Sequence, residues 1–237
     1  SDNTGHVCGR CPACERGDYL LCSEKVNLGL GYGYSGGFTK YCRIPGEILA
    51  IHKRAIWEIP EGLEYEEAAV MDPICNAYKA IAQRSGLLPG ENVVIFGTGP
   101  LGLFSVQIAK IMGALNIVVV GLEEDVKVRF GVARQLGATE VVNGSVEDVV
   151  QRCQEICGGS DSIGLVVDCA GANICLKQAI EMVRCNGEIV RVGMGFKPVG
   201  FSINDISMKA VSIIGHMAYD ATSWRNSLQL LAAGRIQ

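Results

Sequence analysis

Short apolar runs alternate with amphipathic stretches along the chain beyond Pro89. This alternation is typical of βαβ units, which build parallel sheets. Strands are expected at Val93–Phe96, Ile117–Val120, Glu140–Val142, Gly164–Cys169, Glu188–Val192 and Val211–Ile214. Helices are expected between them at Leu101–Met112, Val126–Leu136, Val146–Cys157, Ile174–Arg184 and Ser223–Ala233. The pattern therefore predicts an α/β fold with a doubly wound parallel sheet.

The first 62 residues follow a different pattern, in which Gly and Pro separate short runs such as Phe38–Ile44 and Ile48–Ile51. These runs predict short strands in an irregular β arrangement. A helical pattern begins at Tyr65 and continues to Gly86, and Pro73 is expected to interrupt it near Asp72. We therefore divide the chain into an irregular β section, residues 1–71, and a parallel-sheet domain, residues 72–237.

Composition narrows the class of protein. The chain has 237 residues, 49% of them hydrophobic, and a formal charge of −4. This charge offers no cationic surface, so neither nucleic acid nor a membrane is an expected partner. No apolar run reaches the roughly 18 to 20 residues that cross a bilayer, and the N-terminus does not resemble a signal peptide. The sequence therefore predicts a globular protein of the cytoplasm.

Four of the eleven cysteines lie within fifteen residues, in a C-x2-C-x2-C-x7-C arrangement. Such a segment can fold around one ion and present four thiolates tetrahedrally at about 2.3 Å, leaving no open position for substrate. An iron–sulfur cluster is the alternative, but its usual runs have other spacings and often a Pro after the last Cys, where this chain has Ser23. The segment predicts a structural zinc site, and its ligands are Cys8, Cys11, Cys14 and Cys22.

A glycine-rich turn follows the first strand of the parallel-sheet domain and opens a helix. It has the form G-x-G-x-x-G, in which Gly97 makes the turn, Gly99 admits a pyrophosphate and Gly102 allows close packing of helix and strand. The helix N-terminus adds free amides and a positive dipole end. The turn predicts binding of a dinucleotide, NAD or NADP, by Gly97, Thr98, Gly99, Pro100, Leu101 and Gly102.

The residue expected to bind the adenosine ribose is missing. An acidic residue usually ends the second strand, roughly 20 residues beyond the glycines, but Gly121 stands there. Three acidic residues follow at 123–125 and could either bind the ribose or repel a 2′-phosphate. Lys127 and Arg129, in contrast, could attract a 2′-phosphate. The choice between NAD and NADP therefore stays open. A purely local role, with Asp125 as a helix N-cap, is equally compatible with the pattern.

Taken together, the four-cysteine segment and the dinucleotide turn resemble those of the zinc-containing medium-chain alcohol dehydrogenases, and most closely the polyol, sorbitol and threonine dehydrogenases. The resemblance covers essentially the whole chain. It rests also on Gly36–Tyr41, Glu67–Ala69, Leu88–Glu91, Leu136–Ala138 and Gly187–Gly193. It implies that a Rossmann domain follows the remainder of a GroES-like catalytic domain with its zinc lobe.

In that family a second zinc ion polarises the substrate hydroxyl while hydride passes to the nicotinamide. Of its usual ligands the resemblance places only Asp72 in this chain, where the polyol branch has Glu followed by Pro. Asp before Pro is also an ordinary helix start, so a capping role stays open. The other two ligands are expected upstream of Ser1, and the chain by itself is expected to be inactive.

The resemblance also implies that the nicotinamide amide meets the backbone of Val192, Gly193 and Met194, just after the fifth strand. It implies a homo-oligomer, either a dimer or a tetramer, acting on a small-molecule alcohol or polyol. Two alternative functions stay open at this stage. One is a zinc-free quinone or enoyl reductase of the same superfamily, and the other is a non-catalytic nucleotide-sensing module with a zinc lobe.

Overall fold

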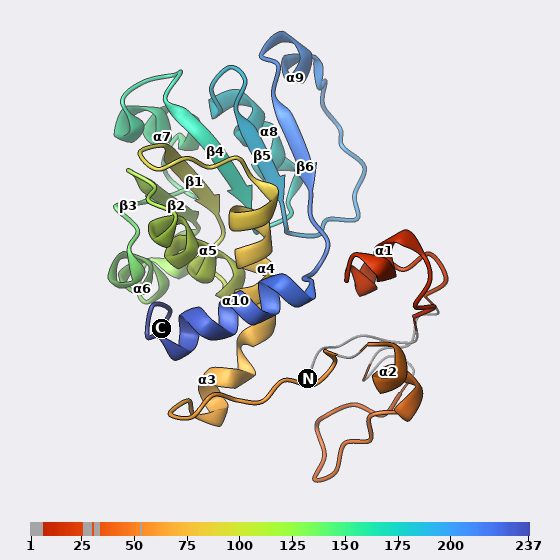
Figure 1. The fold of residues 1–237 in the computed structure, drawn as a ribbon. Helices are drawn as coiled ribbons and strands as arrows, with labels where there is room; N and C mark the ends of the chain where they lie inside the picture. The colour runs from red at the N-terminus through yellow and green to blue at the C-terminus, as the bar shows by residue number, and fades with distance from the viewer. Residues whose placement is uncertain (1–6, 26–29, 31–33, 53) are drawn as a thin grey trace.

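The computed structural model describes residues 7–25, 30, 34–52 and 54–237. Its centre is a parallel sheet of six strands in the order β3-β2-β1-β4-β5-β6 (Figure 1). The strands are β1 (Asn92–Phe96), β2 (Ile117–Gly121), β3 (Glu140–Asn143), β4 (Ile163–Asp168), β5 (Glu188–Arg191) and β6 (Ser212–Gly215). The order reverses between β1 and β4, where open α/β sheets bind their ligands. The predicted doubly wound sheet is confirmed.

The five predicted helices are present with starts and ends shifted by a few residues; the first four lie between strands, and the fifth follows β6. They are α5 (Pro100–Ile111), α6 (Arg129–Leu136), α7 (Val149–Cys157), α8 (Asn173–Met182) and α10 (Ala221–Ala232). Two further elements, the 3-10 turn η3 (Glu123–Asp125) and the short helix α9 (Asn204–Met208), were not predicted. Both are shorter than the window in which a helical period can be recognised.

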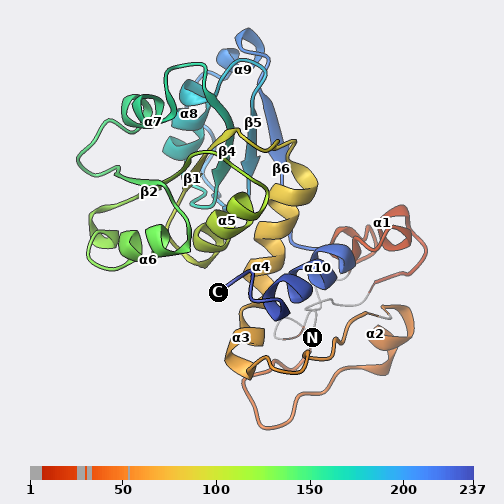
Figure 2. The ribbon, with the colours of Figure 1, turned by 60° about the vertical axis from the view of Figure 1, so that its left-hand side comes forward.

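Each face of the sheet carries its own core because side chains alternate along a strand. Val93 and Ile95 of β1 point into one core, which they share with α5 and α10. Val94 and Phe96 point into the other, which α7 and α8 cover. Figure 2 shows the two helical layers on either side of the strands. All five residues of β1 are buried, as expected for a strand covered on both faces.

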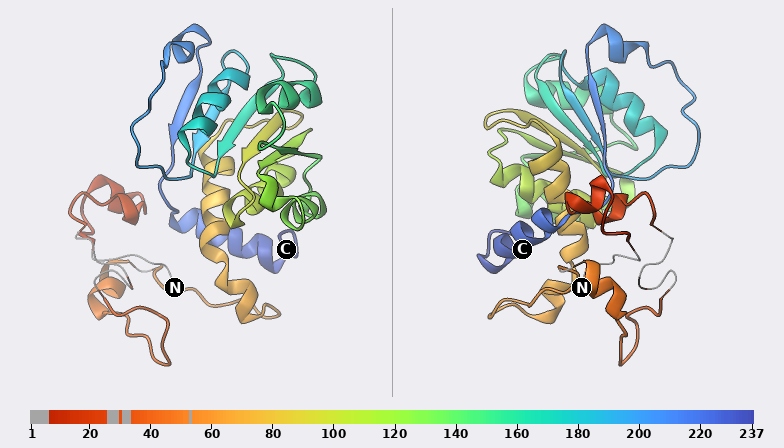
Figure 3. Two further views of the ribbon diagram at one scale, coloured as in Figure 1. Left: turned by 180° about the vertical axis from the view of Figure 1, so that it is seen from behind. Right: turned by 45° about the vertical axis from the view of Figure 1, so that its right-hand side comes forward.

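The helical section before the sheet consists of α3 (Tyr65–Ala69), α4 (Met71–Tyr78) and a π-helical continuation, η2 (Lys79–Arg84). The interruption predicted at Pro73 lies instead at Val70, which ends α3 and precedes α4. Pro73 is accommodated in the first turn of α4 because amides there have no partner within the helix. Both views of Figure 3 show α10 crossing α4. The division of the chain at residue 71 remains a proposal.

The strands predicted near the N-terminus are wrong. Ile48–Ile51 belongs to a helix, α2 (Gly46–Ile51), and Phe38–Ile44 contains no strand. A run of four apolar residues does not distinguish strand from helix, and Ile48 and Ile51 are three residues apart, on one helical face. Two other short elements lie here, α1 (Pro12–Glu15) and the 3-10 turn η1 (Tyr19–Leu21). None of the helices in the described ranges has the length and apolarity needed to cross a membrane.

Candidate zinc and dinucleotide sites

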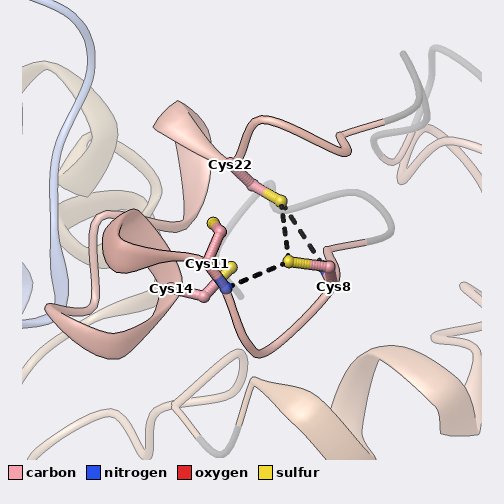
Figure 4. A group of neighbouring side chains, drawn as sticks. All are labelled: Cys8, Cys11, Cys14 and Cys22. Carbon is pink, nitrogen blue, oxygen red and sulfur yellow. Dashed lines mark hydrogen bonds between the residues drawn. The ribbon is translucent and has the colours of Figure 1, made fainter.

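The four cysteines of the N-terminal cluster converge on one point (Figure 4). Their Sγ atoms all lie within 4.8 Å of one another, and those of Cys8 and Cys22 are 3.7 Å apart. Four thiolates about 2.3 Å from a central zinc ion form a tetrahedron with edges of about 3.8 Å. The donor set and its spacing therefore fit one zinc ion. Within the ranges that the structure describes, this is the only group of three or more residues that could hold a metal.

The local backbone supports thiolate ligands. Cys11 is the N-cap of α1, Pro12 is the first helical residue, and the Sγ atoms of Cys11 and Cys8 lie within 4.8 Å of each other. The amide of Cys11 donates to Cys8 Sγ at 3.3 Å, and the amide of Cys8 donates to Cys22 Sγ at 3.4 Å. A hydrogen bond from the Cys14 amide lowers the pKa of Cys11 to about 6, whereas burial raises the pKa of Cys14 to about 12. A bound dication would offset the cost of the buried thiolate, because it deprotonates its thiol ligands.

We call residues 7–25 the zinc lobe. Its apolar core is small, with only Val7, Cys14 and Cys22 fully buried in the cluster, so the lobe has little hydrophobic stabilisation of its own. It contacts the sheet domain through Lys79, whose Nζ lies 3.0 Å from Asp18 and 3.7 Å from Asp220. The Lys79 side chain is 8% exposed, so these two carboxylates compensate a nearly buried charge.

The glycine turn has the geometry that its sequence predicts. Gly97 has φ +102°, a conformation that residues with a side chain rarely adopt. A Cβ on Gly102 would overlap the carbonyl oxygen of Gly97, so only glycine lets α5 start this close to β1. A Cβ on Gly99, in contrast, would meet nothing within 4 Å. The fold therefore does not require a glycine at position 99.

A cleft of about 430 Å³ opens beside this turn. It lies at the carboxyl ends of β1, β2 and β4 and reaches the start of α8, with Gly97, Gly99 and Gly121 in its wall. Its lining also includes Arg129, Cys169 and Ile174. The N-terminus of α5 supplies amides and a positive dipole end at the turn, which suits a pyrophosphate. The shape and position fit the adenosine half of a dinucleotide.

Gly121 is required by packing. A Cβ at this position would lie 2.5 Å from a ring carbon of Phe130 and 2.8 Å from the methyl group of Thr98. An acidic residue at the end of β2 is therefore excluded by the neighbouring side chains. The position predicted for ribose binding can therefore offer only its backbone to a ligand.

Two of the three acidic residues after Gly121 form local hydrogen bonds. Asp125 is buried, accepts the amide of Leu122 at 2.9 Å and lies 3.4 Å from Arg129. It is therefore not the helix N-cap suggested from the sequence, because it closes η3 and α6 begins four residues later. Glu123 accepts a hydrogen bond from Asn143 Nδ2 at 2.6 Å. These bonds account for Asp125 and Glu123 without a cofactor, whereas Glu124 lines the cleft, so the choice between NAD and NADP is still open.

Asp72 lies exposed in the first turn of α4. Asn76, one turn later, donates to its carbonyl at 2.9 Å and to its carboxylate at 3.4 Å. The capping role is excluded because Val70 is the N-cap of α4. Asn76 also contacts His216 at 3.1 Å, which links this turn to the end of β6. His52 and His216 lie apart from the cysteine cluster, and His6 lies outside the described residues.

Sequence analysis missed two charged residues that organise these sites. Lys79 lies inside a helical pattern, and no local feature shows that it faces the zinc lobe. Arg191 ends β5 and forms a 2.7 Å ion pair with Asp168 at the end of β4. The available signal was a charged residue at the carboxyl end of each of two strands that were expected to be buried, Asp168 and Arg191. Buried charges are normally paired, so these two residues could have been expected to form an ion pair.

Residues 100–233 match the family model of the zinc-binding dehydrogenases, and the chain belongs to this family. It is 71% identical over its whole length to the zinc-type alcohol dehydrogenase-like protein YdjL of Escherichia coli, covering 66% of that protein. It is 31% identical to a sorbitol dehydrogenase of Halalkalibacterium halodurans, over 98% of this chain and 64% of that enzyme. The chain thus spans about two thirds of the length of these relatives.

The fold comparison agrees. A zinc-binding dehydrogenase from Sinorhizobium meliloti, solved with NADP bound, superimposes with a TM-score of 0.82 at 28% identity. The match covers 99% of this chain and 66% of that one. The predicted membership of the medium-chain dehydrogenases and the predicted Rossmann-like sheet are therefore confirmed.

Proposed function

We propose that this protein oxidises a secondary alcohol of a polyol or sugar derivative and transfers the hydride to NAD or NADP. The observation that carries the proposal is the glycine turn beside an open cleft at the switch point of the sheet, in a chain of the zinc-binding dehydrogenase family. The alcohol carbon loses a hydride to the nicotinamide and its hydroxyl loses a proton to solvent, which leaves a ketone. The similarity to a sorbitol dehydrogenase supports a polyol over the substrate of a quinone or enoyl reductase.

The residues of this chain would share the work as follows. Gly97 to Gly102 and the start of α5 would hold the pyrophosphate, and the backbone of Gly121 in the cleft wall would face the ribose. The backbone of Val192, Gly193 and Met194 would hold the nicotinamide amide. Cys8, Cys11, Cys14 and Cys22 would hold a structural zinc, and the eleven free cysteines support a reducing compartment such as the cytoplasm.

Asp72 would be a ligand of a catalytic zinc ion that supplies Lewis-acid polarisation of the alcohol when it is bound. A single carboxylate cannot hold zinc tightly, since catalytic sites use three protein ligands. Asn76 would orient Asp72 through the 3.4 Å contact to its carboxylate. The division into a catalytic section, residues 1–71, and a cofactor domain, residues 72–237, belongs to the same proposal.

We also propose that the protein is a homo-oligomer, a dimer or a tetramer. β6 is an edge strand of the sheet, and Ser212, Ile213 and Gly215 are exposed along it. An exposed edge presents unpaired backbone groups that favour pairing with another strand. Sedimentation equilibrium of the full-length protein would test this, and a monomer at every concentration measured would contradict it.

The function is tested by titrating full-length protein with NADH and NADPH, followed by fluorescence, and then by assaying a panel of polyols. Gly99→Val should abolish cofactor binding while leaving the fold intact, because a side chain there meets no protein atom. Gly131→Val, on α6 and also facing open space, is the matched control and should bind as the parent does. A parent that binds neither cofactor, or a Gly99→Val protein that binds normally, would refute the proposal.

A further inference from the structure

Two loops leave the sheet side by side at its carboxyl edge, residues 169–172 after β4 and residues 192–195 after β5. Asp168, the last residue of β4, has no exposed surface. One carboxylate oxygen accepts the amides of Ala170 at 3.0 Å and Gly171 at 2.8 Å, and the other accepts Arg191 Nη1 at 2.7 Å. The carboxylate therefore fixes the first loop and binds Arg191, the residue before the second loop.

The same pair also fixes the second loop. The carbonyl oxygen of Asp168 accepts the amides of Val192 at 2.9 Å and Gly193 at 2.7 Å. Arg191 completes the arrangement, because its Nη2 donates to the carbonyl of Gly171 at 2.7 Å. Both side chains are thus bonded to the first loop, and the backbone carbonyl of Asp168 holds the start of the second loop.

The loops touch each other without intervening side chains. A Cβ on Gly193 would overlap the amide nitrogen of Gly171, and one on Gly195 would overlap the carbonyl oxygen of Gly171. Backbone in such close contact transmits a shift of one loop directly to the other. The position of Val192 and Gly193 therefore depends on where Asp168 and Arg191 hold Gly171.

A need for stability does not explain this ion pair. Asp168 and Arg191 are register partners on adjacent strands whose other buried positions are apolar. Burial raises the pKa of Asp168, so the protein environment penalises the charge that the pair requires. Well-packed apolar residues often replace a buried ion pair without loss of stability. What apolar residues could not provide are the side-chain hydrogen bonds to three backbone groups of the first loop, the amides of Ala170 and Gly171 and the carbonyl of Gly171.

We propose that Asp168 and Arg191 are positioning residues that hold the loop of residues 192–195 where it binds the nicotinamide half of the cofactor. The inference rests on the proposed function, since it assumes that NAD or NADP occupies the cleft. The adenosine half would be held independently by the glycine turn and Gly121. Disturbing the pair should therefore weaken the binding of the nicotinamide half more than that of the adenosine half.

The variant Arg191→Lys tests the binding of the nicotinamide half of the cofactor separately from that of the adenosine half. Lysine retains the charge and can bond to Asp168, but it lacks the planar fork that also reaches Gly171. In the full-length protein we expect the Kd for the reduced cofactor that the parent prefers to rise at least about tenfold. We expect the Kd for ADP-ribose, or for its 2′-phosphate if NADPH is preferred, to change less than about twofold. Lower kcat should accompany the change, since misplaced nicotinamide transfers hydride poorly.

Arg184→Lys is the matched control. Arg184 makes the same type of contact at the opposite end of the sheet, 2.8 Å from Glu91 and 3.1 Å from the carbonyl of Cys185. It should leave both dissociation constants unchanged. The double variant Asp168→Asn with Arg191→Met removes both charges, so it should fold with a thermal midpoint close to that of the parent and still lose affinity for the reduced cofactor.

The results distinguish the two proposals. A parent protein that binds neither reduced cofactor nor ADP-ribose would overturn the proposed function and this inference with it. A parent that binds both, with an Arg191→Lys variant that binds the reduced cofactor normally, would overturn the inference alone. Equal losses of affinity for the reduced cofactor and ADP-ribose in Arg191→Lys would also overturn it, because they would show a general effect on the cleft.

Discussion

Alanine substitutions at Gly102 and Gly99 test most directly whether these two glycines have separate roles in the turn. In Gly102→Ala the new methyl group would overlap the Gly97 carbonyl oxygen and lie 2.8 Å from its carbon, where about 3.5 Å is needed for contact. α5 would have to move away from β1 by on the order of an ångström or more, because the oxygen overlap is larger than that with the carbon. Seven of its twelve residues, from Gly102 to Ala109, are buried, so the shift would disturb a close-packed layer.

Overpacking of this kind typically costs about 1–3 kcal/mol, and Gly102→Ala should lie at the upper end because its contact is with backbone. For a chain of this size about 3 kcal/mol lowers Tm by roughly 6–12 °C. Gly99→Ala should change stability by less than about 0.5 kcal/mol, since the added methyl group meets nothing. Urea unfolding followed by circular dichroism measures both values. Equal midpoints for Gly102→Ala and Gly99→Ala would refute the assignment of separate roles to these glycines.

Further predictions concern the zinc lobe, the ribose position and the titratable groups. Cys14→Ala should lower the zinc content by one ion per chain in elemental analysis and leave cofactor binding intact; an unchanged content would remove the cluster as a metal site. Gly121→Asp would supply an acidic residue at the ribose position, but it should destabilise the fold by on the order of 2 kcal/mol because its side chain would clash with the ring of Phe130. A gain in NAD affinity at unchanged stability would contradict this. Burial lowers the pKa of His216 to about 4, below the value near 6.5 of the unfolded chain, so stability should fall as pH drops from 6.5 to 4 by about 2–3 kcal/mol. His216→Gln should flatten that profile in urea titrations, and an unaltered pH dependence would show that other groups cause the loss. Asp72→Asn in the full-length protein should reduce polyol oxidation at least about tenfold without affecting cofactor affinity, and an unchanged rate would exclude Asp72 from the catalytic site.

The sequence by itself determined the parts of this protein that rest on local geometry. The six strands and their crossover helices were predicted because apolar runs and amphipathic stretches have distinct periods. The turn-forming role of Gly97 and the packing role of Gly102 were predicted because both depend on backbone close to the end of β1. The cysteine cluster was equally local, since its four cysteines lie within fifteen residues and their Sγ atoms converge.

Only the tertiary structure decided the rest. Gly121 proved to be required by Phe130, and Asp125 proved to be an internal partner of Leu122, because contacts across a turn are not encoded in a residue's type. The same holds for Asp168 and Arg191, which are 23 residues apart in the chain. They meet because parallel strands place their carboxyl ends at one edge, and this edge forms only when the whole sheet has assembled.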